Sequence, residues 1–69
     1  MKIETYIDDK NVITIEFKKL DATNYIWTIL KDGKFCCECF VPYATEEGMY
    51  ESARLKVREL FPNATLQND

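Results

Sequence analysis

The stretch that decides the fold is Thr45–Phe61, TEEGMYESARLKVRELF. Its apolar residues recur every three or four positions, at Met49, Ala53, Val57 and Leu60. Charged residues fill the opposite side, so the spacing predicts an amphipathic helix with one buried face. Thr45 is a suitable N-cap, and Pro62 cannot continue the helix because it lacks a backbone N–H. Such a helix needs a second layer to pack against, and that layer must come from the residues before it.

Four segments before the helix have strand character: Lys2–Ile7, Val12–Lys18, Tyr25–Lys31 and Lys34–Val41. The first two alternate apolar and polar residues, which is the period of a half-buried strand. The polar residues 8–11 separate them, and Asp32-Gly33, a pair typical of tight hairpin turns, joins the last two. The predicted order is ββββα: a four-stranded antiparallel meander with one C-terminal helix packed on one face, in the α+β class.

The chain is short and rich in apolar residues. With 69 residues, 46% of them hydrophobic, it is expected to form one small domain spanning positions 1–69. The tail, Asn63–Asp69, offers only Leu66 to bury, so we expect it to fray.

Charge and hydropathy narrow the class of protein. The formal net charge is -3 and the chain has no His, so nucleic acid is disfavoured as a partner. The sequence contains no long apolar run, so we expect no contact with a membrane. Its first residues, MKIETYIDD, lack the apolar core of a signal peptide, and we expect a cytoplasmic protein.

No residue set has the spacing of a catalytic or cofactor site. Cys36, Cys37 and Cys39 are odd in number and crowded into one strand, which argues against a disulfide framework. Strand geometry turns Cys36 away from its two neighbours and no His is available, so we expect neither a metal site nor a cofactor. The Asp and Glu residues fall in turns, on outward strand positions or on the charged side of the helix. We therefore expect no enzyme activity.

The tight turn predicts which side chains of the last two strands share a face. It places Ile29 opposite Cys36 and Trp27 opposite Glu38. One face then carries no charge: Ile26, Thr28, Leu30, Phe35, Cys37, Cys39 and Val41. The other carries aromatic, apolar and charged residues: Tyr25, Trp27, Ile29, Cys36, Phe40, Lys31, Lys34 and Glu38. We assign the charge-free face to the helix because burying the other would bury charges. A longer turn would change the parity of the pairing and undo these assignments.

The second face would remain apolar and uncovered, which is typical of an interface. We therefore predict a partner-binding surface made of Tyr25, Trp27, Ile29, Phe40, Lys31, Lys34 and Glu38. The function this favours is that of a small acidic protein-binding module, an accessory or inhibitory regulator of the kind that phages or mobile elements encode. Its partner would be another protein or a second copy in a homodimer. In one alternative Tyr6, Leu66, the tail or the loop at Leu20 covers these rings. In another the helix covers Trp27, and Ile26, Leu30 and Phe35 form the surface instead.

From Tyr25 onward the chain carries the pieces W-x-I-x-x-D-G-K and T-E-E, at Trp27, Ile29, Asp32, Gly33, Lys34, Thr45, Glu46 and Glu47. In this it resembles the small DNA-binding modules of the AP2 type and of tyrosine-integrase N-terminal domains, in which such a hairpin leads into a helix. The resemblance implies nucleic-acid binding as the alternative function. Those families read the major groove with a face rich in Arg and Lys, whereas this hairpin offers Lys31 and Lys34 beside Glu38.

Overall fold

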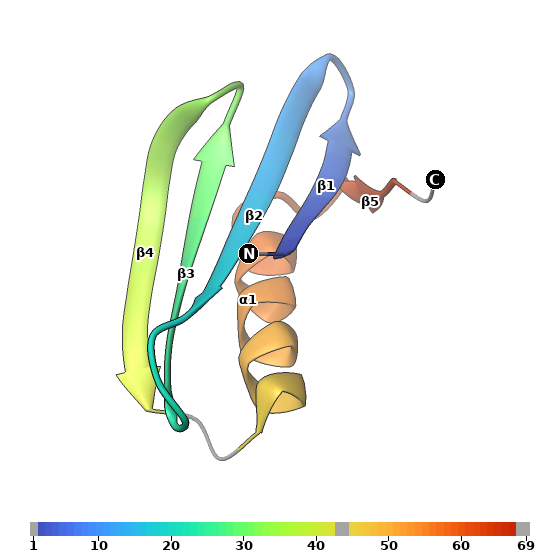
Figure 1. Ribbon diagram of the computed structural model, residues 1–69. Coiled ribbons are helices and arrows are strands. Elements are labelled where there is room, and N and C mark those ends of the chain that lie inside the picture. The colour runs from blue at the N-terminus through green and yellow to red at the C-terminus, as the bar shows by residue number, and fades with distance from the viewer. Residues whose placement is uncertain (1, 43–44, 68–69) are drawn as a thin grey trace.

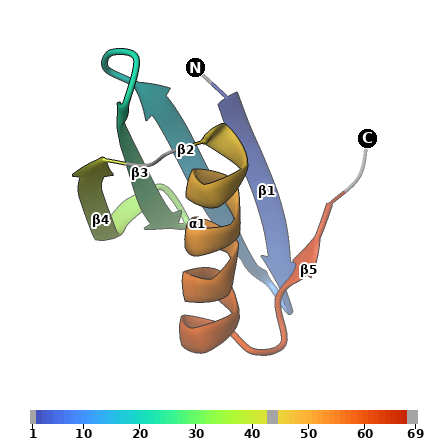
Figure 2. The same cartoon turned by 90° about the horizontal axis from the view of Figure 1, so that it is seen from below.

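The computed structural model describes residues 2–42 and 45–67, and within them the predicted meander and helix are confirmed. The elements are β1 (Lys2–Asp8), β2 (Asn11–Lys19), β3 (Asn24–Lys31), β4 (Lys34–Pro42), α1 (Glu46–Leu60) and β5 (Thr65–Leu66). The strands form one antiparallel sheet in the order β4-β3-β2-β1-β5, and α1 lies against one face of it (Figures 1 and 2). The fold is therefore α+β, with a short fifth strand beyond the predicted set.

The helix has the predicted N-cap and most of the predicted buried face. Gly48 donates its backbone N–H to Thr45 Oγ1 at 3.1 Å, which satisfies one of the free amides of the first turn. The residues of α1 that are buried in the core are Met49, Ala53 and Val57. Leu60, in the last turn, stays exposed, and the adjacent Phe61 packs against the core instead.

The β3–β4 turn has the predicted geometry. Both central residues have positive φ, +52° at Asp32 and +80° at Gly33. The turn is also fastened to the neighbouring hairpin, because Val12 donates its N–H to Asp32 Oδ1 and Asp32 donates its own N–H to the Val12 carbonyl, both at 2.8 Å. Asp32 therefore shapes the turn and joins it to β2.

We expect Gly33→Val to lower the free energy of unfolding by about 1 kcal/mol or more, because a β-branched residue is strained at positive φ. A Cβ at this position would have no heavy atom within 4 Å, so crowding would not contribute to the loss. Gly33→Asn is the matched control, since Asn tolerates this backbone region. Urea unfolding of the two variants measures the effect; equal midpoints for valine and asparagine would refute a backbone origin.

The β3–β4 register differs from the predicted one by a β-bulge. Leu30 pairs with Phe35 as expected, but Ile29 then pairs with Cys37, so that Cys36 is an extra residue on β4. Beyond the bulge Trp27 lies opposite Cys39, where the sequence had suggested Glu38. One inserted residue reverses which side chains of β4 share a face with β3, because side chains alternate along a strand.

The face that α1 covers is the opposite of the one assigned from the sequence. The fully buried residues of the sheet are Ile13 and Ile15 on β2 and Ile29 on β3, and Trp27 and Tyr25 are almost completely buried beside them. In the middle of β2 the residues of this side, Ile13, Ile15 and Phe17, are all apolar and buried, whereas Thr14, Glu16 and Lys18 on the other side are polar. The β2–β3 register places Ile29 beside Ile15 and Trp27 beside Phe17, so β2 determines which side of β3 is buried.

The tail also differs from the expectation, because part of it is ordered against β1. Leu66 pairs with Tyr6 and Thr65 with Ile7, and Gln67 donates its N–H to the Thr5 carbonyl at 2.8 Å. The backbone hydrogen bonds to the free edge of β1 compensate for the scarcity of apolar side chains in this segment. Residues 68 and 69 of the predicted frayed tail lie outside the described residues.

Candidate interaction surface

The structure divides the predicted partner-binding residues into three groups. Tyr25, Trp27 and Ile29 lie in the core between β3 and α1, with Trp27 only 4% exposed, so they cannot form a free surface. Phe40 and Glu38 lie on the other side of the sheet, because the bulge at Cys36 turns them there. Lys31 and Lys34 are exposed and pair with each other at the end of the β3–β4 hairpin. The surface proposed from the sequence does not exist as a single patch.

A different apolar surface lies on the sheet face opposite α1, which we call the open face. Two cross-strand pairs of large side chains, Ile26 with Phe40 and Leu30 with Phe35, occupy it on β3 and β4. Phe35 is 68% exposed and Phe40 is 58% exposed. A sheet face that contacts only water normally alternates to polar residues, so this exposure marks a surface that another molecule could cover. It is the surface expected in the alternative in which α1 covers Trp27.

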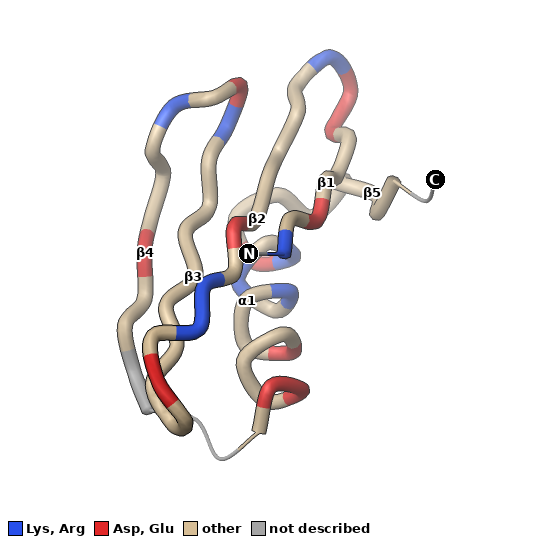
Figure 3. The backbone as a smooth tube through the Cα atoms, viewed as in Figure 1, with Lys and Arg blue, Asp and Glu red and all other residues tan. Residues whose placement is uncertain are grey.

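A polar row separates the two apolar pairs. Glu16 on β2 lies beside Thr28 on β3, which lies beside Glu38 on β4, so the three residues cross the open face perpendicular to the strands. Thr28 donates its hydroxyl to Glu38 Oε2 at 3.2 Å. Figure 3 shows the acidic positions on β2 and β4. Lys18, the cation on this face of β2, lies beside Ile26.

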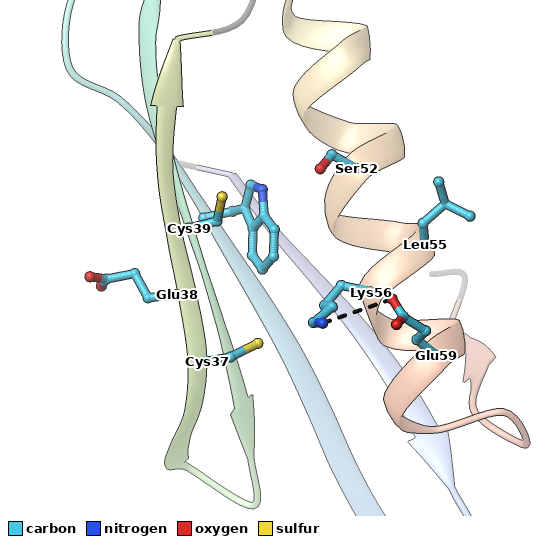
Figure 4. A pocket seen from close by; sticks show the side chains of 8 residues that line it. Cys37, Glu38, Cys39, Ser52, Leu55, Lys56 and Glu59 are labelled. Carbon is cyan, nitrogen blue, oxygen red and sulfur yellow. Dashed lines mark ion pairs between the residues drawn. The ribbon is translucent and has the colours of Figure 1, made fainter.

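A groove on the other side of the sheet separates β4 from α1, because the helix leaves β4 partly uncovered. Its volume is about 450 Å³. Cys37 and Cys39 point into it, whereas Glu38 points away (Figure 4). Lys56 and Glu59 form an ion pair at 3.8 Å on its helix side. Burial raises the pKa of the Cys37 thiol, which keeps it protonated at neutral pH.

The cysteines are free thiols in two different settings. Cys36, the bulge residue, is exposed, while Cys37 and Cys39 are half-buried and line the groove. Among residues 2–42 and 45–67, no group of three or more His, Cys, Asp and Glu side chains is arranged to hold a metal ion.

One buried polar cluster was missed from the sequence. Glu4 on β1 faces α1, is only 8% exposed and accepts two hydrogen bonds from Arg54, one of them from Nε at 2.9 Å. These bonds hold the pKa of the Glu4 carboxyl below its usual range, against the opposing effect of burial, and Glu4 raises the pKa of Arg54. Glu4 and Arg54 are fifty positions apart in the sequence, so no pattern of neighbouring residues predicts their pairing. It neutralises Glu4, and its role is to connect β1 with α1.

The comparisons with known proteins do not supply a function. No family model, no curated protein and no solved structure matches this chain. Within the described residues no helix has the length and hydropathy required to cross a bilayer. The open face combines Lys18 with Glu16 and Glu38, so it lacks the excess of Arg and Lys on which the nucleic-acid-binding families rely.

Proposed function

We propose that this chain is a non-catalytic protein-binding module, an accessory or inhibitory protein that contacts its partner through the open face. The observation that supports the proposal is the exposure of Phe35 and Phe40, at 68% and 58%, on a sheet face that α1 does not cover. Burying one such side chain is worth roughly 1.5 to 3 kcal/mol, so the two phenylalanines and their neighbours supply a driving force for association.

The positions of the acidic residues support a binding role over a catalytic one. Glu4, the carboxylate with both strong burial and a lowered pKa, is neutralised by Arg54 and lies between β1 and α1. Glu38 lies on the edge strand β4 between Phe35 and Phe40, where it accepts a hydrogen bond from the Thr28 hydroxyl. A charge flanked by apolar side chains is suited to fixing the orientation of a partner.

Affinity capture from a lysate of the native host tests this proposal. We expect wild type to retain a protein that Phe35→Ser/Phe40→Ser loses, because the double change removes the two most exposed large apolar side chains of the described residues while leaving the core intact. Leu55→Ser is the matched control, since Leu55 is also exposed but lies on α1. It should retain the same protein as wild type.

Two results would count against the proposal. Retention that is equal for wild type and the double phenylalanine variant would show that the open face does not bind. Loss of retention in Leu55→Ser with the phenylalanine variant unaffected would move the contact to the helix side. Circular dichroism of each variant establishes that it is folded before the capture is interpreted.

A further inference from the structure

Along β3 and β4 the open face carries an apolar pair, then the polar row, then a second apolar pair. Along β3 the open-face residues are Ile26, Thr28 and Leu30. Each pairs with one residue of β4: Ile26 with Phe40, Thr28 with Glu38, and Leu30 with Phe35. Alternate residues of a strand are about 7 Å apart, so the two apolar pairs lie about 13 Å from each other with the polar row midway between them. A ligand that covers both pairs must also cover the row.

The row carries two carboxylates that no ion pair among the described residues neutralises, and the open face of β2 to β4 has one cation, Lys18, in the neighbouring row beside Ile26. The ion pairs found among residues 2–42 and 45–67 involve neither Glu16 nor Glu38. The hydrogen bond from Thr28 draws the Glu38 carboxylate toward the middle of the face. Covering two carboxylates with a purely apolar surface would remove their hydration without compensation, which is strongly unfavourable. The occupant must therefore bring positive charge to the centre of its contact.

A second copy of the chain brings more negative than positive charge to this contact, because its own open face carries Glu16 and Glu38 but a single lysine, Lys18, on β2 to β4. In a two-fold dimer that joins open face to open face, the axis lies in the plane of the interface. If it runs along the row, each carboxylate of Glu16 and Glu38 opposes its own counterpart; if it runs along β3, Glu16 opposes Glu38. Both arrangements place carboxylates against carboxylates in a poorly hydrated contact, where like charges repel. An axis midway between the rows of Glu16 and Lys18 would place these two residues against each other, but the two faces together would still bring four carboxylates and two lysines into the contact.

We infer that the partner presents a basic segment to the open face, with a Lys or Arg side chain between two apolar positions. The cation lies over Thr28 between Glu16 and Glu38, and the apolar side chains cover the pairs Ile26–Phe40 and Leu30–Phe35. An Arg guanidinium suits this place because it can donate hydrogen bonds to both carboxylates. This inference rests on the proposed function and adds to it the chemistry of the partner.

Selection from a phage-displayed library of random dodecapeptides tests the inference, with wild type and Glu16→Gln/Glu38→Gln as parallel targets. Glutamine keeps the shape of both side chains and can still accept the Thr28 hydroxyl, so the fold should be unchanged. We expect peptides selected on wild type to contain Lys or Arg between apolar residues and to bind the glutamine variant about tenfold more weakly at low salt. Glu47→Gln/Glu51→Gln, which changes the same charge at exposed positions of α1, should bind them like wild type.

The other outcomes separate this inference from the proposed function. Peptides that require Phe35 and Phe40 but show no excess of basic residues, or bind the glutamine variant equally well, would overturn the inference alone. Failure to select any peptide that requires the two phenylalanines would overturn both. A concentration-dependent dimer in sedimentation experiments that Phe35→Ser/Phe40→Ser abolishes would replace the basic partner by a second copy.

Discussion

Trp27→Ala is expected to unfold most of the protein. Trp27 is 4% exposed and packs between the sheet and α1, so truncation removes a large buried side chain and leaves a cavity. Such changes lower the free energy of unfolding by about 3 to 5 kcal/mol. A domain of this size has a total stability of roughly 3 to 10 kcal/mol, so the variant should be partly or largely unfolded without denaturant.

Urea unfolding followed by circular dichroism is the appropriate measurement, because Trp27 is the chain's single tryptophan and its loss removes the fluorescence signal. Phe40→Ala is the matched control: it also removes an aromatic side chain, but from the open face. It should change the free energy of unfolding by no more than about 0.5 kcal/mol. If Trp27→Ala were as stable as Phe40→Ala, the assignment of Trp27 to the core would be wrong.

Glu4→Gln should produce the second largest loss of stability, about 2 to 3 kcal/mol at neutral pH. The change removes the charge that Arg54 binds with two hydrogen bonds and leaves the guanidinium without its counter-ion. The estimate is below that for a fully buried pair because Arg54 is about a third exposed. Glu59→Gln, which removes the exposed ion pair with Lys56, should cost no more than about 0.5 kcal/mol.

The loss caused by Glu4→Gln should depend on pH in a defined direction. Arg54 holds the pKa of Glu4 lower in the folded protein than in the unfolded chain. The contribution of the Glu4 carboxylate to stability is therefore complete above the pKa that Glu4 has in the unfolded chain. It disappears as the pH falls through the lower pKa that Glu4 has in the folded protein. The difference in urea midpoint between wild type and Glu4→Gln should be largest near neutral pH and should shrink in acid. A difference independent of pH would show that Glu4 stabilises the fold by packing alone.

The sequence by itself determined the elements whose signals are local. Met49, Ala53 and Val57 recur at helical spacing and are the buried face of α1, and Thr45 is its cap. Asp32-Gly33 is a tight turn because both residues adopt positive φ. Helix caps, helical spacing and turns depend on neighbours a few residues away, and a single sequence contains all of that information.

Only the tertiary structure decided which sheet face is buried. β2 alone has an unambiguous apolar side, and the loop before β3 does not reveal how Phe17 and Trp27 are matched across the two strands. The bulge at Cys36 then places Glu38 and Phe40 on the side opposite Trp27, whereas the sequence predicted that they share its face, so these two residues remain on the side that α1 leaves uncovered. Because side chains alternate along a strand, one residue of register or one bulge exchanges the two faces completely.

The same physics explains why an uncovered apolar face was predicted although, of the residues assigned to it, only Phe40 and Glu38 lie there. Both sides of β3 are apolar, and one helix covers only one of them, so an uncovered face follows from composition. The choice of Ile26, Leu30 and Phe35 over Tyr25, Trp27 and Ile29 for that face depends on the alignment of β3 with β2. That alignment depends on contacts between residues distant in sequence, and these exist only once the sheet has formed.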